Sequence, residues 1–178
     1  ARGLSAMSGG WNQVSAKSVK IDATGTEQSG YAYGVYGESG GCNTITAEGD
    51  VTITAKGAAA NAGMVYNGSA ASHGINLIDA KGDVRVTASG GYASNIGMWA
   101  TGFGGNEIRN AKSVSVKAES TGALNCTAMY ANGDKATGAV GAYNSIHDVA
   151  GAVTIIAKGA TGSSSSTSGN IGMLAYNG

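Results

Sequence analysis

Hydrophobic and polar residues alternate in five short segments of this chain, and each segment reads Val-x-(Ile or Val)-x-Ala. Because alternate side chains of a strand point to opposite faces, the apolar residues of each segment share one face. Helix is disfavoured because the segments are short, β-branched and bounded by glycine. The pattern therefore predicts five strands with one buried face, beginning at Val19, Val51, Val84, Val114 and Val153.

The five segments are copies of one repeated unit. Subtracting successive first valines (19, 51, 84, 114 and 153) gives steps of 32, 33, 30 and 39 residues. Two more patterns recur in a fixed order: Asn-x-(Ile or Val) comes before the segment, and a small residue followed by an apolar one, usually Gly-Met, comes after it. A period of about 20 to 50 residues is typical of solenoids.

Three short strands in each period predict one coil of a parallel β-helix. Coils stack at the spacing of hydrogen-bonded strands, about 4.8 Å, so equivalent residues form columns. We expect an all-β protein, a parallel β-helix of about five coils of 30 to 39 residues, each with three strands. Residues 1–178 form a single array, and because neither end carries a polar cap we expect it to be a fragment of a longer one.

Asparagine is the most regular polar feature of the repeat. Stacked side-chain amides can hydrogen-bond from coil to coil, and asparagine also tolerates the left-handed turn conformation. The sequence predicts a structural ladder rather than a ligand site, formed by Asn12, Asn43, Asn76, Asn106 and Asn144. A second set precedes the Gly-Met strand in the same manner and comprises Asn61, Asn95, Asn125 and Asn170.

The Gly-Met strand supplies the candidate interaction surface. If its apolar column points into the core (Leu4, Val35, Met64, Met98, Met129, Met173), the next residue in each coil must point outward. The outward column is Tyr36, Val65, Trp99, Tyr130 and Leu174. Exposed aromatic rings stack on sugars or pack against proteins, so Tyr36, Trp99 and Tyr130 are the predicted contact residues. Two alternatives remain, namely that a loop or a neighbouring filament covers the stripe, or that these residues are core.

Composition limits the partners. Eleven Lys and Arg balance eleven Asp and Glu, so no basic field favours nucleic acid. No run approaches the ~20 apolar residues of a membrane helix, so we expect no membrane insertion by this segment. With 12% charged residues the surface must consist of Ser, Thr, Gly, Asn and Ala, which suits a secreted solenoid.

Few residues have the spacing that catalysis or metal binding requires. Asp50 and Asp83 share a place in adjacent coils, and Asp79 faces Arg109 one coil on. Two carboxylates fall short of the six to eight oxygens that calcium prefers, so we expect ion pairing or solvation there. Neighbouring coils have serine where Asp50 and Asp83 stand.

The histidines and cysteines also form no recognisable site. His73 and His147 fall at different points of the repeat and form no triad or metal spacing. Cys42 and Cys126 are nearly three coils apart, which predicts two unpaired, buried thiols. We therefore expect no enzyme activity, no cofactor and no metal.

The repeats of this chain resemble those of a known class of exported proteins. The segments 43–47, 49–55 and 63–68 are similar to repeats in the passenger regions of Gram-negative autotransporters and filamentous-haemagglutinin-like adhesins. The resemblance implies a right-handed β-helix at the bacterial cell surface, attached to the outer membrane through parts not present here. It also implies partners such as a glycan or protein of a host or neighbouring cell, or other copies of the array.

Three functional hypotheses follow. The first is an exported structural or adhesive β-helix stalk, which fits the repeat, the neutral polar surface and the resemblance. The second is a self-assembling extracellular filament subunit. The third is a polysaccharide-processing enzyme similar to pectate lyases, whose β-helices use aspartates for calcium and an arginine as base; the Asp50 and Asp83 column and Arg109 would take these roles.

Overall fold

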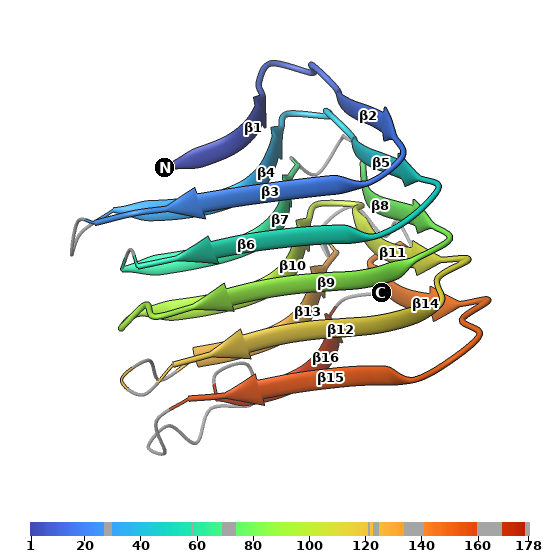
Figure 1. The fold of residues 1–178 in the computed structure, drawn as a ribbon. Helices are drawn as coiled ribbons and strands as arrows, with labels where there is room; N and C mark the ends of the chain where they lie inside the picture. Colours follow the sequence, from blue (N-terminus) through green and yellow to red (C-terminus); the bar gives the residue numbers. More distant parts are fainter. Residues whose placement is uncertain are drawn as a thin grey trace.

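The chain forms a parallel β-helix in which every coil contributes one strand to each of three sheets (Figure 1). A computed structural model describes residues 1–26, 30–57, 59–68, 74–120, 122, 125–133, 141–159 and 169–176. All regular structure in these ranges is β-strand, and no described element is a helix that could cross a membrane. The predicted fold, a parallel β-helix with three strands in each coil, is confirmed.

The strands stack strictly in parallel within each sheet. Sheet A consists of β1 (Arg2–Ala6), β4 (Tyr31–Glu38), β7 (Ala60–Asn67), β10 (Ser94–Thr101), β13 (Asn125–Asn132) and β16 (Asn170–Tyr176). Sheet B consists of β2 (Asn12–Ala16), β5 (Asn43–Ala47), β8 (Ile75–Ala80), β11 (Gly105–Arg109) and β14 (Tyr143–His147). Sheet C consists of β3 (Val19–Thr24), β6 (Val51–Lys56), β9 (Asp83–Ser89), β12 (Ser113–Glu119) and β15 (Val153–Lys158).

The core is a column that runs through the stacked coils. The Val, Ile and Ala residues of sheet C pair in exact register, and in the central coils they are fully buried. They pack against Ile45, Ile78 and Ile108 of sheet B and against Met64, Met98 and Met129 of sheet A. In β15 the column is less protected, and Val153 is 48% exposed, because that strand is paired on one side only. The predicted apolar columns are therefore present.

The asparagine column of sheet B forms a continuous hydrogen-bonded ladder. Each amide nitrogen donates to the Oδ1 of the next asparagine at 2.7–2.8 Å, through Asn12, Asn43, Asn76, Asn106 and Asn144. The same nitrogens also donate to backbone carbonyls of sheet A, those of Tyr36, Val65, Trp99, Tyr130 and Leu174. The ladder thus joins successive coils and fastens sheet B to sheet A.

The second asparagine set differs from its prediction. Asn61 donates to Asn95 Oδ1 at 2.9 Å, but the position paired with Asn95 in the next coil is Cys126 rather than Asn125. Asn125 stands one residue earlier, beside Ser94. Asn125 is three residues before Ala128, whereas Asn61 and Asn95 are two residues before the equivalent glycine, so strand register places Cys126 in the column.

Both cysteines are free thiols, as predicted. Cys126 is buried, and burial raises the pKa of its thiol. Cys42 is half-buried, so the expectation that both thiols are buried is wrong for this residue. It directly precedes the fully buried Asn43, and alternation along the chain turns neighbouring side chains to opposite faces.

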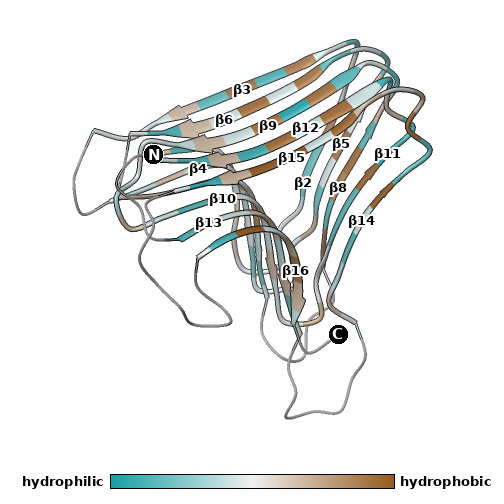
Figure 2. Ribbon diagram, turned by 90° about the horizontal axis from the view of Figure 1, so that it is seen from below, coloured by the Kyte–Doolittle hydropathy of each residue, from teal (hydrophilic) through white to brown (hydrophobic). Residues whose placement is uncertain are grey.

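Sheet A is bent, whereas sheet C is straight (Figure 2). At the bend two successive positions face the core, as Ala128 and Met129 show in β13, because both belong to the main core cluster. Glycine occupies the first of these positions in most coils. A Cβ atom at Gly63 would contact the Val86 side chain and lie 2.7 Å from the carbonyl oxygen of Gly97, so glycine permits the close approach. The bend makes the outer face of sheet A concave.

Candidate functional site

The predicted aromatic stripe lies on the outer face of sheet A, but much of it is covered. Strand pairing places Tyr36, Val65, Trp99 and Tyr130 in one row, outside the main core cluster, as alternation required. However, Tyr36 is only 6% exposed and Val65 only 1% exposed, while Trp99 and Tyr130 are half-buried. The expectation of an exposed stripe is therefore wrong for Tyr36 and Val65.

The bend explains this burial. Outward residues on the two arms of the bent strands lean toward each other and form a second apolar cluster, separate from the main core. The cluster contains Tyr36, Ala62 and Val65, with Tyr33, Ile96 and Trp99 packed against it. Side chains of sheet A itself thus cover the buried part of the stripe. Its burial requires neither a covering loop nor an inverted register.

Three tyrosine rings of β4 are stacked side by side on this face. The ring centroids of Tyr31 and Tyr33 are 5.6 Å apart, and those of Tyr33 and Tyr36 are 5.0 Å apart. The Arg2 guanidinium lies 4.2 Å from the centroid of the Tyr36 ring. Burial, followed by the neighbouring Tyr31 and Tyr36, raises the pKa of Tyr33 to about 12, so its hydroxyl keeps its proton at neutral pH.

A slot opens in this concave face. It has a volume of about 260 Å³. The residues that line it come from three successive coils and are Tyr31, Tyr33, Ala60, Asn61, Ala62, Ala93, Ser94, Ile96 and Trp99. Of the predicted contact residues only Trp99 lines the slot, and sequence reasoning missed the others. The sequence did contain a signal for the other lining residues, namely the alternation in the three residues before each glycine of the motif. There Tyr31-x-Tyr33 aligns with Ala60-x-Ala62 and Ser94-x-Ile96.

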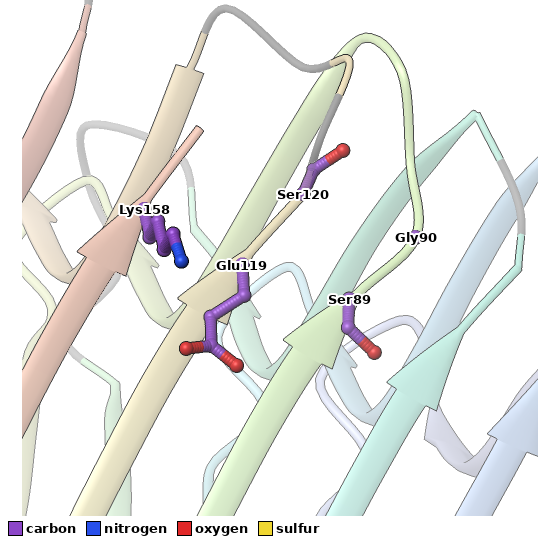
Figure 3. A pocket seen from close by; sticks show the side chains of 5 residues that line it. All are labelled: Ser89, Gly90, Glu119, Ser120 and Lys158. Atoms are coloured by element: carbon purple, nitrogen blue, oxygen red, sulfur yellow. The ribbon is translucent and has the colours of Figure 1, made fainter. Parts of the chain in front are cut away.

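A second hollow lies where sheet C turns toward sheet A (Figure 3). Its volume is about 420 Å³, and Ser89, Glu119 and Lys158 line it from the ends of three adjacent strands, together with Gly90 and Ser120. One carboxylate, one ammonium group and two hydroxyls give it no dominant charge. This hollow therefore points to no particular ligand.

The acidic residues weighed as catalytic or calcium-binding groups are engaged in ion pairs. Arg109 Nε donates to Asp79 at 2.8 Å, as predicted from the register, and Arg109 Nη1 to Glu107 at 3.2 Å. Hydrogen bonds from Asn110, and then Arg109, lower the pKa of Asp79. Asp83 accepts from Ser113 and Arg85, and those contacts lower its pKa in that order. Both carboxylates are therefore charged at neutral pH.

Asp50 is used differently. Its Oδ1 accepts the backbone N–H of Asp83 at 2.8 Å, which links the start of β9 to the preceding coil. Within the described part of the chain, no group of three or more His, Cys, Asp and Glu could hold a metal ion. The structure thus brings Asp79 and Arg109 together but does not gather the other aspartates around them.

His147 lies at the end of β14, beside two carboxylates. Its Nδ1 is 2.7 Å from Asp148 Oδ2, and its Nε2 is 3.4 Å from Glu107 Oε1, one coil away. These contacts, with Asp148 first, raise the pKa of His147 above its usual value. His73 lies outside the described residues.

We expect His147 to make the stability of the array depend on pH. Because its pKa is raised in the folded state, the added stability is complete below the unfolded pKa of about 6.5 and disappears as pH rises through the higher folded value. The measurement is the melting temperature from about pH 5.5 to about pH 8.5, for the wild type and for His147→Gln. The difference between the two proteins should be largest at the acidic end, and a difference that does not change with pH contradicts the prediction.

Comparison with protein-family models, with curated proteins and with solved structures found no match to this chain. The parallel β-solenoid fold therefore stands on the strand pairing itself, and the resemblance to autotransporter and adhesin repeats remains one of sequence pattern.

Proposed function

We propose that the chain is the structural and adhesive β-helix of an exported bacterial cell-surface protein, a stalk that binds through its side wall and does not catalyse a reaction. The observation that supports this most is the concave apolar face of sheet A, with its slot of about 260 Å³. An apolar hollow on a neutral surface with few charges is typical of an interaction site. The resemblance of the repeats adds export and the cell-surface location to the proposal.

The ladder and the core columns suit the structural part of this role. The hydrogen bonds of the asparagines and the sheets run through successive coils, so load along the axis is shared by many parallel bonds. A side wall held this rigidly keeps the slot in shape before a partner arrives, which lowers the entropy cost of binding.

The proposed partners are a glycan or protein on a host or neighbouring cell, or another copy of the array. Ring stacking on a sugar needs a free aromatic face, but Tyr33 has a tyrosine on each side and Tyr36 lies between Tyr33 and Arg2. Tyr31, at the rim and 59% exposed, is the most accessible ring of the stack. These contacts favour a protein partner over a glycan.

Adhesion of the purified protein to cultured cells, and its binding to a glycan array, tests the proposal. We expect wild-type protein to bind cells and Tyr31→Ser to bind less, with an unchanged melting temperature because the side chain is exposed. Trp11→Ser is the matched control, since Trp11 is also exposed but does not line the slot. Wild-type protein that binds neither cells nor glycans would contradict the adhesive role.

Two other functions are separated by simple measurements. A filament subunit would show a sedimentation coefficient that rises with protein concentration, because the coils of a second copy would extend the same columns. An enzyme similar to pectate lyases would cleave polygalacturonate in the presence of calcium and lose that activity in Asp83→Ala or Arg109→Ala. The ion pairs of both residues make them poor candidates for catalysis.

A further inference from the structure

The slot exists because one coil carries smaller side chains than its neighbours. In the outward columns of sheet A, Tyr31 pairs with Ala60 and then Ser94, while Tyr33 pairs with Ala62 and then Ile96. The two alanines of β7 therefore form a floor between a wall of tyrosines on β4 and a wall on β10. The floor is one strand wide, so the two walls are about two strand spacings, roughly 10 Å, apart.

We infer that this slot is a binding site for one uncharged aromatic side chain of a protein partner, an inference that rests on the adhesive role proposed above. None of the described residues that line the slot is charged. Its volume of about 260 Å³ is below the range of roughly 300–1,000 Å³ usual for whole small-molecule ligands. A neutral hollow of this size takes a single ring and not a cofactor or an oligosaccharide.

The geometry of the tyrosine wall favours an aromatic ring over an aliphatic group. Because Tyr31 and Tyr33 are stacked on each other, a group that enters the slot beside them meets ring edges and not ring faces. Ring edges carry partial positive charge and attract the electron-rich face of another ring in an edge-to-face arrangement. A saturated sugar or a branched alkyl chain gains no such attraction.

Trp99 supplies a second, independent observation. Its indole Nε1 is buried and has no hydrogen-bond partner in the described structure, although buried donors are nearly always paired. Trp99 also lines the slot. Because that nitrogen is closed to solvent, what Trp99 offers an occupant is the part of its indole ring that lines the slot, a further aromatic surface.

The apolar surface that continues beyond the slot favours a side chain of a polypeptide over a free aromatic molecule. The row that includes Trp99 extends to the half-buried Tyr130 in the next coil, along the same concave face. A free ring would leave this apolar surface unused, whereas a polypeptide anchored by one ring can lie along it. Interfaces commonly consist of such an anchor with weaker contacts around it.

The test uses the whole chain and three defined probes. N-acetyl-tryptophanamide, N-acetyl-leucinamide and methyl glucoside are titrated into protein labelled at its alanine and isoleucine methyl groups, and the NMR shifts are followed. We expect the tryptophan probe to shift Ala60, Ala62 and Ile96 in a saturable manner, and to bind at least about tenfold tighter than the leucine probe. No shift at these methyl groups, or larger shifts with methyl glucoside, would overturn the inference.

Two variants fill the slot and separate this inference from the adhesive role. Ala60→Leu and Ser94→Leu come from the floor and from one wall, and either should weaken binding of the tryptophan probe at least about tenfold. Thr46→Leu is the matched control, because Thr46 is exposed on sheet B. A folded filling variant that binds the probe as the wild type does refutes the slot, even if cells are still bound. If the wild type does not adhere to cells, the adhesive role is refuted. The probe measurement then still shows whether the slot binds an aromatic ring.

Discussion

Replacing Val84 by Asp should destabilise the array by about 4 kcal/mol or more. Val84 lies at the middle of its column, is fully inaccessible to solvent, and pairs with Val51 and Val114 in the coils on either side. A carboxylate there has no partner in the apolar column, and the burial of the valine side chain is lost as well. Since whole domains are stable by only about 5–15 kcal/mol, this is a large share of the total stability.

The matched control for this change is Val153→Asp. Val153 belongs to the same column but is 48% exposed, so a charge there remains hydrated and should cost little. The measurement is the free energy of unfolding from urea titration of the wild type and both variants. Equal losses at the two positions would mean that burial does not set the cost, and would contradict the assignment of this column to the core.

The second large effect is expected at the centre of the asparagine ladder. Asn76 accepts from Asn43 at 2.7 Å and donates to Asn106 Oδ1 and to the Trp99 carbonyl, both at 2.8 Å. Asn76→Ala removes all three bonds: the buried Asn106 Oδ1 and the Trp99 carbonyl lose this donor, and the Asn43 amide keeps only its bond to the Val65 carbonyl. Each orphaned group costs about 1–3 kcal/mol, so we expect a total loss of about 3–5 kcal/mol.

Asn12→Ala is the control that separates the loss of stability caused by breaking the centre of the ladder from the loss that any asparagine-to-alanine change would cause. Asn12 makes two bonds of the same kind, to Asn43 Oδ1 and to the Tyr36 carbonyl, but it is only partly buried. Water can replace part of what is lost, and we expect a loss of about 1 kcal/mol. Urea titration again gives the comparison, and a loss at Asn76 no greater than that at Asn12 would show that the ladder adds nothing to the central coils.

The asparagine ladder could be predicted from the sequence because it depends only on the two-residue alternation along a strand and on the repeat of the coils. Alternation along each strand selects the inward residues, and parallel stacking in register brings the same position of successive coils together. Asn76 therefore meets Asn43 and Asn106 without any knowledge of the loops. The Asp79–Arg109 ion pair followed from the same register.

The second asparagine set marks the limit of that reasoning. Asn125 stands three residues before Ala128, whereas Asn61, Asn95 and Asn170 stand two residues before the glycine of their motif, and strand pairing places Cys126 in the column. A shift of one residue changes which side chain faces inward, so an asparagine continues this column only where its distance from the motif is the same.

Sequence alone determined the repeat, the parallel β-helix, the core columns and the ladder, because each depends on local alternation and on a regular period. Only the tertiary structure decided the shape of the outer face of sheet A. There the strand bends, two consecutive residues face inward, and outward residues of the two arms meet, which buries Tyr36 and Val65. A prediction from simple alternation always places consecutive residues on opposite faces, so it cannot yield two inward residues in succession. The slot, in turn, depends on differences in side-chain size between neighbouring coils, which matter only once the bend has brought the walls and the floor together.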